Sequence, residues 1–234
     1  MRDPRERLIV ALDVPTPAAA QKIVAAVGES ASTFKVGMQL FTAAGPGIVR
    51  DLVASGRRVF LDLKYHDIPN TVAAAVREAA QLGVSMLTVH ASGGGKMLRA
   101  ATDAARQADP NLLVLAVTVL TSIDDAVLGE IGVRAPVLDQ VLRLTGLAVA
   151  SGCGGVIASP LEASELRRKL GHDFAIVTPG VRPSGGRVDD QARIATPAEA
   201  IAAGATYIVV GRPITAAENP AAEASAILEQ IKAA

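Results

Sequence analysis

The sequence of 234 residues is poor in aromatic residues and has no excess charge of either sign. It contains no tryptophan, its aromatic content is 3%, and 23 basic residues balance 23 acidic ones. A general nucleic-acid-binding protein would carry a basic excess and usually aromatic side chains on which bases stack. The composition therefore argues against a nucleic acid as partner.

Cysteine is nearly absent from the chain. The single cysteine, Cys153, excludes an intrachain disulfide and a cysteine-cluster metal site. It lies in the small-residue run ASGCGG, with no histidine or basic residue near it in the sequence. We therefore expect a buried structural thiol rather than a nucleophile.

Long hydrophobic runs are also missing. The first residues, MRDPRERLIVALD, include acidic residues and too short an apolar stretch for a signal peptide. No run reaches the length of a membrane span. We therefore expect a soluble, cytoplasmic protein that does not use the membrane as a partner.

Short apolar runs rich in β-branched residues recur along the chain, with helical patterns between them. Most of these runs start 25–33 residues apart, which is the size of a strand–helix unit. The eight expected strands are Leu8–Leu12, Thr33–Val36, Arg58–Asp62, Met86–His90, Leu112–Val117, Gly155–Ile157, Phe174–Val177 and Tyr207–Val210. The eight expected helices are Pro17–Val27, Gly45–Ala54, Pro69–Leu82, Gly95–Ala108, Val137–Ser151, Leu161–Leu170, Pro197–Ala203 and Ala221–Ala233.

The alternation of strands and helices allows either a doubly wound sheet or a closed barrel. Eight units favour the (β/α)8 TIM barrel, because closure leaves no edge strand to protect. We predict one α/β domain of this type over residues 1–234. Of two long connections, 118–136 is expected to contain a short helix. The other, 178–196, follows strand seven at the active-site face of such barrels and is predicted to be a lid that closes over a phosphate.

Charged residues stand where a barrel strand should be apolar, in the segment VFLDLKYHDIPNTV. Asp62 and Lys64 are two residues apart, so in an extended chain their side chains point to the same side. A purely structural ion pair is the less favoured interpretation, because buried pairs are poor sources of stability. For Asp67 two roles remain open, a helix cap and a functional group of the site.

Other polar residues end the neighbouring strands. Asp13 follows LIVAL and Lys35 lies in TFKVG, so both are expected at the same mouth of the barrel. His90 ends strand four, where hydrogen-bonded architecture is the more common role of a lone histidine. The other histidines, His66 and His172, lack a metal-ligand spacing with carboxylates.

A phosphate site is indicated after the last strand. Gly211 and Arg212 follow it directly, at the start of a short helix, where barrels commonly bind phosphate. In the loop between residues 178 and 196, Arg182 and Gln191 could close over the same group.

Taken in order, these motifs closely resemble the orotidine 5′-monophosphate decarboxylase family, in its compact bacterial type. The resemblance covers nearly the whole chain, through ALDVP, FKVGMQLF, FLDLKYHDIPNTV, TVHASGG, VTVLTS, TPGVRP, DDQAR and VVGRPIT. It implies decarboxylation of orotidine 5′-monophosphate to uridine 5′-monophosphate (UMP), the last step of UMP synthesis, without metal or organic cofactor.

The resemblance also implies roles for individual residues. Lys64 is similar to the family's proton donor to C6 of the pyrimidine. Lys35, Asp62, Lys64 and Asp67 resemble its alternating charged network, in which Asp67 comes from the partner subunit of a homodimer.

The remaining implied positions bind the nucleotide. Asp13 and Lys35 resemble the pair that contacts the ribose, joined across the dimer interface by Asp67 and Thr71. Thr121 matches a nucleotide-binding position after strand five. The residues that match the phosphate grip and its lid are Arg182, Gln191, Gly211 and Arg212.

Two other functions are weighed against this one. A magnesium-dependent sugar-phosphate decarboxylase or aldolase of the same superfamily shares the D-x-K-x-x-D core but usually has glycine soon after the last aspartate. Here Ile68 and Pro69 follow Asp67. A catalytically silent binding protein is the other alternative, and the intact set of Asp62, Lys64 and Asp67 argues against it.

Overall fold

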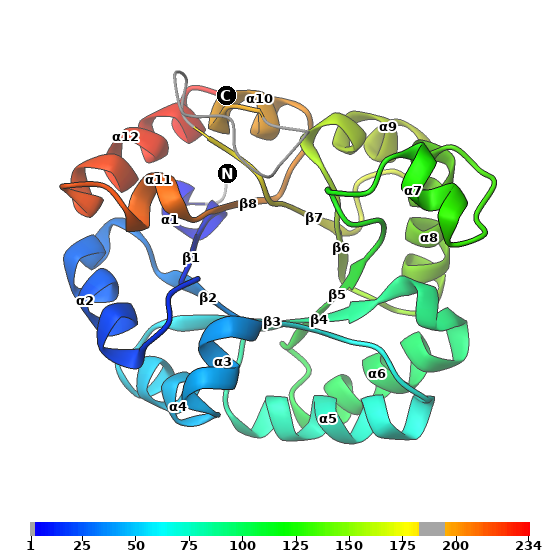
Figure 1. The fold of residues 1–234 in the computed structure, drawn as a ribbon, viewed down its shortest axis with the longest axis horizontal. Coiled ribbons are helices and arrows are strands. Elements are labelled where there is room, and N and C mark those ends of the chain that lie inside the picture. The colour runs from blue at the N-terminus through cyan, green and yellow to red at the C-terminus, as the bar shows by residue number, and fades with distance from the viewer. Residues whose placement is uncertain (1–2, 183–194) are drawn as a thin grey trace.

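The structure, a computed structural model, describes residues 3–182 and 195–234. Its strands run parallel and form a closed barrel in sequence order, with β1 paired to both β2 and β8 (Figure 1). The strands are β1 (Leu8–Ala11), β2 (Thr33–Gly37), β3 (Arg58–Tyr65), β4 (Met86–His90), β5 (Leu113–Val117), β6 (Gly155–Ile157), β7 (Ala175–Thr178) and β8 (Tyr207–Val210). The predicted TIM barrel is confirmed.

Helices form a ring outside the barrel (Figure 1). All eight expected helices are present within two residues of their predicted bounds, as α2 (Pro17–Val27), α4 (Gly47–Ala54), α5 (Pro69–Gln81), α6 (Gly94–Ala108), α8 (Val137–Ala150), α9 (Pro160–Leu170), α10 (Pro197–Ala202) and α12 (Pro220–Lys232). Several begin with proline after a capping side chain. Thr16, for example, accepts a hydrogen bond from the Ala19 N–H at the start of α2.

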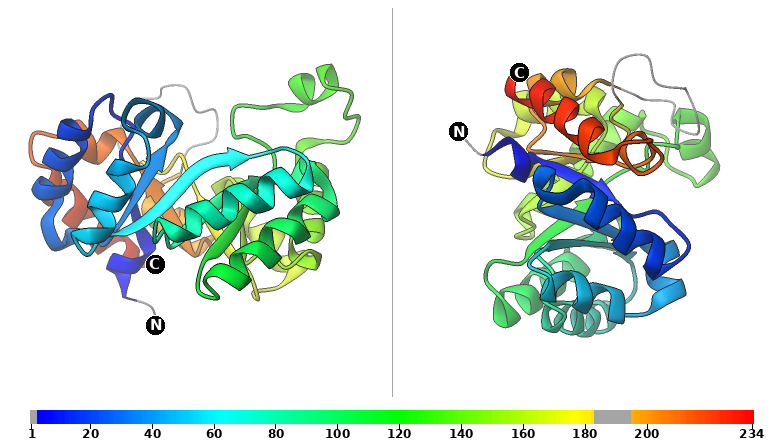
Figure 2. Two further views of the ribbon diagram at one scale, coloured as in Figure 1. Left: turned by 90° about the horizontal axis from the view of Figure 1, so that it is seen from below. Right: turned by 90° about the vertical axis from the view of Figure 1, so that its left-hand side faces the viewer.

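Short helices complete the described chain. The expected helix in the 118–136 connection is α7 (Asp125–Glu130), and the one after the last strand is α11 (Arg212–Thr215). The sequence analysis did not predict α1 (Pro4–Arg7), α3 (Met38–Ala44) or the two 3-10 turns η1 (Gly28–Ser30) and η2 (Ala91–Gly93). In the side view, α7 projects from the barrel on the side opposite to the C-terminus (Figure 2).

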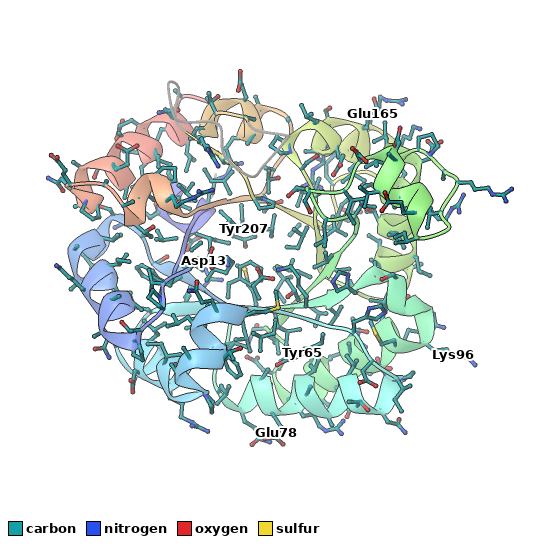
Figure 3. The ribbon with its side chains drawn as sticks, in the orientation of Figure 1. Asp13, Tyr65, Glu78, Lys96, Glu165 and Tyr207 are labelled. Atoms are coloured by element: carbon teal, nitrogen blue, oxygen red, sulfur yellow. The ribbon has the colours of Figure 1, made fainter. Side chains whose placement is uncertain are left out.

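The apolar core has two layers. The larger lies between the strands and the helices, and the smaller fills the barrel with side chains that include Ile9, Phe60, Met86 and Leu115. Figure 3 shows Glu78, Lys96 and Glu165 on the outer rim and Tyr207 close to the barrel centre. The barrel is therefore a packed core rather than a pore.

The third strand is longer than expected. The predicted end at Asp62 is wrong, since β3 continues to Tyr65, which pairs with Val89 of β4 after a register shift. Within this shift Lys64 has a φ of 54°, and it is the one non-glycine residue with positive φ in the described ranges. The irregularity keeps Tyr65 paired with β4, and it changes the direction of the backbone at Lys64.

The thiol is where the sequence analysis expected it. Cys153 is buried, and burial raises its pKa to about 12.

Across residues 3–182 and 195–234, no helix combines the length and apolarity that crossing a membrane requires.

Candidate active site

Side chains that point into the barrel are apolar at its centre and polar at the carboxyl ends of the strands. On β3, Phe60 belongs to the interior cluster, and Asp62, two residues later on the same face, lines a cavity above it. The register places Lys35 beside Phe60 and Gly37 beside Asp62. Parallel strands thus bring charges far apart in the sequence to one end of the barrel.

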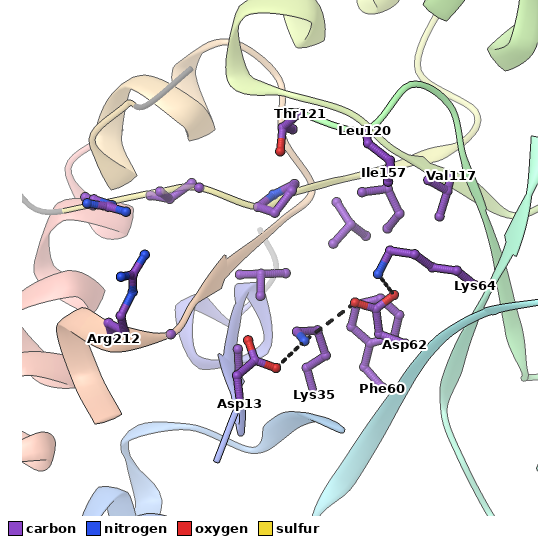
Figure 4. Close-up of a pocket in the computed structure, with 18 of the residues that line it drawn as sticks. Asp13, Lys35, Phe60, Asp62, Lys64, Val117, Leu120, Thr121, Ile157 and Arg212 are labelled. Atoms are coloured by element: carbon purple, nitrogen blue, oxygen red, sulfur yellow. Dashed lines mark hydrogen bonds and ion pairs between the residues drawn. The ribbon is translucent and has the colours of Figure 1, made fainter. Parts of the chain in front are cut away.

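Four of these side chains form a line of alternating charge (Figure 4). Lys35 Nζ lies 2.9 Å from Asp13 Oδ1 and 3.5 Å from Asp62 Oδ2. Lys64 Nζ lies 2.8 Å from Asp62 Oδ1. We call the set Asp13, Lys35, Asp62 and Lys64 the charge chain. The sequence-based expectation that Asp62 and Lys64 lie together is confirmed.

Burial gives the charge chain its electrostatic character. The Asp62 side chain is 13% exposed and that of Lys35 is 11% exposed. Burial alone would raise the pKa of Asp62, but the Lys35 and Lys64 ammonium groups and hydrogen bonds from Lys64 and Thr88 hold it below its ordinary value. Asp62 is therefore an anion at neutral pH.

Two residues that the sequence analysis did not single out support this arrangement. A side chain at Gly37 would place its Cβ 3.0 Å from both Asp13 Oδ1 and Lys35 Nζ, so glycine leaves room for that pair, and a larger residue would push its charged ends aside. Thr88 of β4 hydrogen-bonds to Asp62 and to the Lys64 backbone. Thr88 lies two residues before His90 on the same strand, so the two side chains are on the same face of β4. This spacing was the sequence signal that could have identified Thr88 as a site residue.

One cavity of about 490 Å³ opens at this end of the barrel. The structure brings eight of the predicted site residues to its wall: Asp13, Lys35, Asp62, Lys64, Thr121, Arg182, Gly211 and Arg212. In the close-up, Arg212 lies across the cavity from Lys64, and Thr121 lies at the upper edge of the cavity (Figure 4). The cavity thus has a second cationic group at the end away from Lys64.

The position of Arg212 follows from the local sequence. β8 ends at Val210, Gly211 is the N-cap of α11, and Arg212 is the first residue of that helix. Gly211 lies beside Ala11 of β1, where an added Cβ would make an ordinary contact at 3.6 Å from the Ala11 Cβ. The arginine is therefore anchored where the last strand meets the first.

Three predicted residues are not at this cavity. Asp67 and Thr71 are exposed and do not line it, and Gln191 lies outside the described residues, as does most of the predicted lid. The helix-cap interpretation of Asp67 is wrong, because the N-cap of α5 is Ile68 and Asp67 accepts a hydrogen bond from the adjacent Ile68 N–H at 2.6 Å.

His90 is not among the residues that line the cavity. Its ring centroid is 5.3 Å from that of His66. Burial, together with the nearby His66 and Lys64, lowers the pKa of His90 below its ordinary value, which favours a neutral ring. Among the described residues, no group of three or more histidine, cysteine, aspartate or glutamate side chains could hold a metal ion.

A barrel with a charge network at the carboxyl ends of its strands, and an arginine across the cavity, defines a TIM-barrel enzyme that acts on a small charged substrate. Comparison with known proteins narrows this class. The chain belongs to the Orotidine 5'-phosphate decarboxylase / HUMPS family, whose model matches residues 6–227.

Individual relatives match nearly end to end. The chain is 56% identical over 228 residues to the orotidine 5'-phosphate decarboxylase of Halorhodospira halophila, covering 97% of each chain. It is 51% identical to the enzyme of the same name from Moorella thermoacetica, covering 97% of this chain and 93% of that one. The crystal structure of orotidine 5'-phosphate decarboxylase from Lactobacillus acidophilus superposes with a TM-score of 0.87 at 41% identity, over 97% of this chain and 99% of that chain.

Proposed function

We propose that this chain converts orotidine 5′-monophosphate to UMP and carbon dioxide, the last step of UMP synthesis. The observation that carries the proposal is the charge chain at one side of a cavity whose other side holds Arg212. Relatives named for this activity, at 56% and 51% identity over nearly the whole chain, support it.

The chemistry calls for a fixed cation at the reacting carbon. When the bond between C6 and the carboxylate breaks, carbon dioxide leaves and the electron pair stays on C6, which has no attached electron sink. A positive charge already in place stabilises this carbanion without reorganisation. Lys64 supplies that charge, because its ammonium group is held by Asp62 at 2.8 Å beside the cavity.

Lys64 then acts as the general acid. Its Nζ transfers a proton to C6, which gives UMP and leaves a neutral amine that regains a proton from water. Lys35 lies on the side of Asp62 opposite to Lys64 and helps to keep Asp62 ionised. Each group of the charge chain has a neighbour of opposite charge, so all four groups can stay charged. Asp13 and Lys35 also bind the ribose.

The far side of the cavity binds the phosphate. Arg212, Gly211 and Arg182 line it and offer charge-assisted hydrogen bonds to a phosphate dianion. Thr121, on the wall after β5, contacts the nucleotide. We also propose that the 178–196 segment is a lid that closes over the phosphate and that Gln191 is one of its phosphate-binding residues.

The proposed enzyme is a homodimer in which Asp67 and Thr71 reach the partner's site. Both side chains are exposed and lie away from the cavity of their own chain. The adjacent Ile68 is 67% exposed, an apolar surface that a partner would cover. These observations support a role across an interface rather than within the chain.

Mixing two inactive variants tests the shared site. Lys64→Ala and Asp67→Ala chains, denatured together and refolded, should regain about a quarter of wild-type activity, because half of randomly formed dimers are mixed and each carries one intact site. No recovery, with dimers confirmed by sedimentation, would contradict the placement of Asp67 in the partner's site.

The substrate class is tested with the wild-type protein. We expect loss of the orotate-type ultraviolet absorbance with orotidine 5′-monophosphate, unchanged by a chelator, and no release of carbon dioxide from 3-keto sugar phosphates. Turnover of the sugar phosphate that stops on chelation would instead establish the magnesium-dependent alternative.

The location in the cell belongs to the same proposal. We expect the enzyme in the cytoplasm, and recovery of the decarboxylase activity in the periplasmic or membrane fraction would contradict this.

A further inference from the structure

We propose that Thr88, the middle residue of β4, is a positioning residue that holds Asp62 and Lys64 in their reactive geometry. The inference rests on the proposed function, since the geometry of the pair matters to the rate only if Lys64 meets the carbanion.

The Thr88 hydroxyl connects both members of the pair. Its Oγ1 accepts a hydrogen bond from the Lys64 backbone N–H at 2.9 Å and donates one to Asp62 Oδ1 at 3.0 Å. A hydroxyl has one hydrogen and two lone pairs, so it can do both at once. The same Asp62 oxygen accepts from Lys64 Nζ at 2.8 Å. The three hydrogen bonds close a ring around the pair.

The backbone shows why this hydroxyl is needed. Leu61 pairs with Leu87 and Tyr65 pairs with Val89, so three residues of β3 lie opposite the single residue Thr88. Lys64 lies in that bulge with a φ of 54°, a left-handed conformation that residues with a Cβ rarely adopt. The Thr88 side chain accepts the Lys64 N–H within the bulge, where the regular pairing of the two strands is interrupted.

Burial makes the contact hard to replace. Thr88 has no solvent-exposed surface, so water cannot take over its hydrogen bonds at low cost. A valine at this position would keep the shape of the side chain while leaving the Lys64 N–H without its acceptor and Asp62 without one donor. The Lys64 backbone would then relax from its strained conformation, and its ammonium group would shift relative to C6.

The contact also bears on the charge of Asp62. The charged and titratable groups around this carboxylate are Lys35 of β2, Lys64 of β3 and His90 of β4. Thr88 acts with the two lysines to lower the pKa of Asp62. Without the hydroxyl, protonation of Asp62 begins at higher pH, so the acid limb of the kcat profile shifts upward.

The test compares Thr88→Val and Thr88→Ser with the wild-type enzyme in the orotidine 5′-monophosphate assay. We expect Thr88→Val to lower kcat by about tenfold or more, with KM within about threefold, because the phosphate side of the cavity is untouched. Thr88→Ser keeps the hydroxyl and should restore most of kcat and the wild-type acid limb.

Each outcome decides the matter. A Thr88→Val enzyme with wild-type kcat, or a Thr88→Ser enzyme as slow as Thr88→Val, would overturn the positioning role, as would equal acid limbs in Thr88→Val and wild type. If Thr88→Val does not fold by circular dichroism, Thr88→Ala takes its place with the same criteria. A wild-type protein without turnover would instead overturn the proposed function.

Discussion

Lys35 is the residue on which the charge chain depends most. It lies between two carboxylates, and its side chain is 11% exposed, against 57% for Asp13. Loss of Lys35 would remove the cation between Asp13 and Asp62 and leave the buried Asp62 with Lys64 alone as its ion-pair partner, which is unfavourable. The alternation of charge therefore explains how four ionised groups can stand side by side above an apolar barrel interior.

The space for this arrangement is set by Gly37. We predict that Gly37→Ala lowers kcat/KM by about tenfold to a hundredfold, because the added Cβ would push aside the Asp13 and Lys35 side chains, which in the proposed function bind the ribose and keep Asp62 ionised. Steady-state kinetics on the purified variant measure this. The matched control is Gly47→Ala, at a helix start where a Cβ meets nothing within 4 Å. Equal activity of the two variants would refute the role of Gly37.

At the scale of single elements, β3 shows what the sequence could and could not predict. The apolar run to Leu61 marked the strand, and the charges that follow marked the site. The continuation to Tyr65 depends on pairing with β4 after the bulge, a contact between residues 24 positions apart. A local pattern contains no information on such a long-range contact. For this reason the strand end was missed, and so were the hydrogen bonds that join Thr88 to Asp62 and Lys64.

Helix α9 is tied to the barrel by a side chain that no pattern revealed. The Arg167 guanidinium donates to the backbone carbonyls of Gly204 at 3.0 Å and Phe174 at 2.8 Å, and to Thr206 Oγ1 at 3.0 Å. It also lies 5.0 Å from the centre of the Phe174 ring. One arginine thereby joins α9 to the segments that enter β7 and β8.

We predict that Arg167→Lys lowers the free energy of unfolding by about 1–3 kcal/mol, because an ammonium group cannot reach all three acceptors. Urea denaturation followed by circular dichroism measures the loss. The neighbouring Arg168→Lys is the control, since Arg168 pairs with Glu165 on an exposed face and should leave the unfolding curve unchanged. Equal curves for all three proteins would contradict the anchoring role of Arg167.

For the whole molecule, the alternation of strands and helices together with the count of eight units favoured the closed barrel over a doubly wound sheet, and the structure confirms it. The barrel rule then placed Asp13, Lys35, Asp62 and Lys64 at one mouth, because parallel strands all end there. The zero net charge was uninformative about this site, since the cluster is itself balanced. The roles proposed for Asp67 and Thr71 require a second chain, which a single sequence pattern does not describe, and Gln191 lies outside the described residues.

The two sides of the cavity should act together in catalysis. We predict that Arg212→Ala lowers kcat as well as raising KM, because in the proposed mechanism the phosphate that Arg212 binds drives closure of the lid and does not serve affinity alone. Kinetics on orotidine 5′-monophosphate and on phosphate-free orotidine separate the effects, and the variant should match wild type on orotidine. A change in KM alone, with kcat intact on the nucleotide, would contradict this coupling.

The most direct test of the account is the rate of decarboxylation by Lys64→Ala. We predict that kcat on orotidine 5′-monophosphate, measured with a chelator present, falls about a thousandfold or more, because the variant lacks both the cation and the proton for C6. Lys232→Ala, which removes an exposed lysine on α12, should keep wild-type activity. Turnover by Lys64→Ala at the wild-type rate would contradict the central claim that the charge chain carries out the reaction through Lys64.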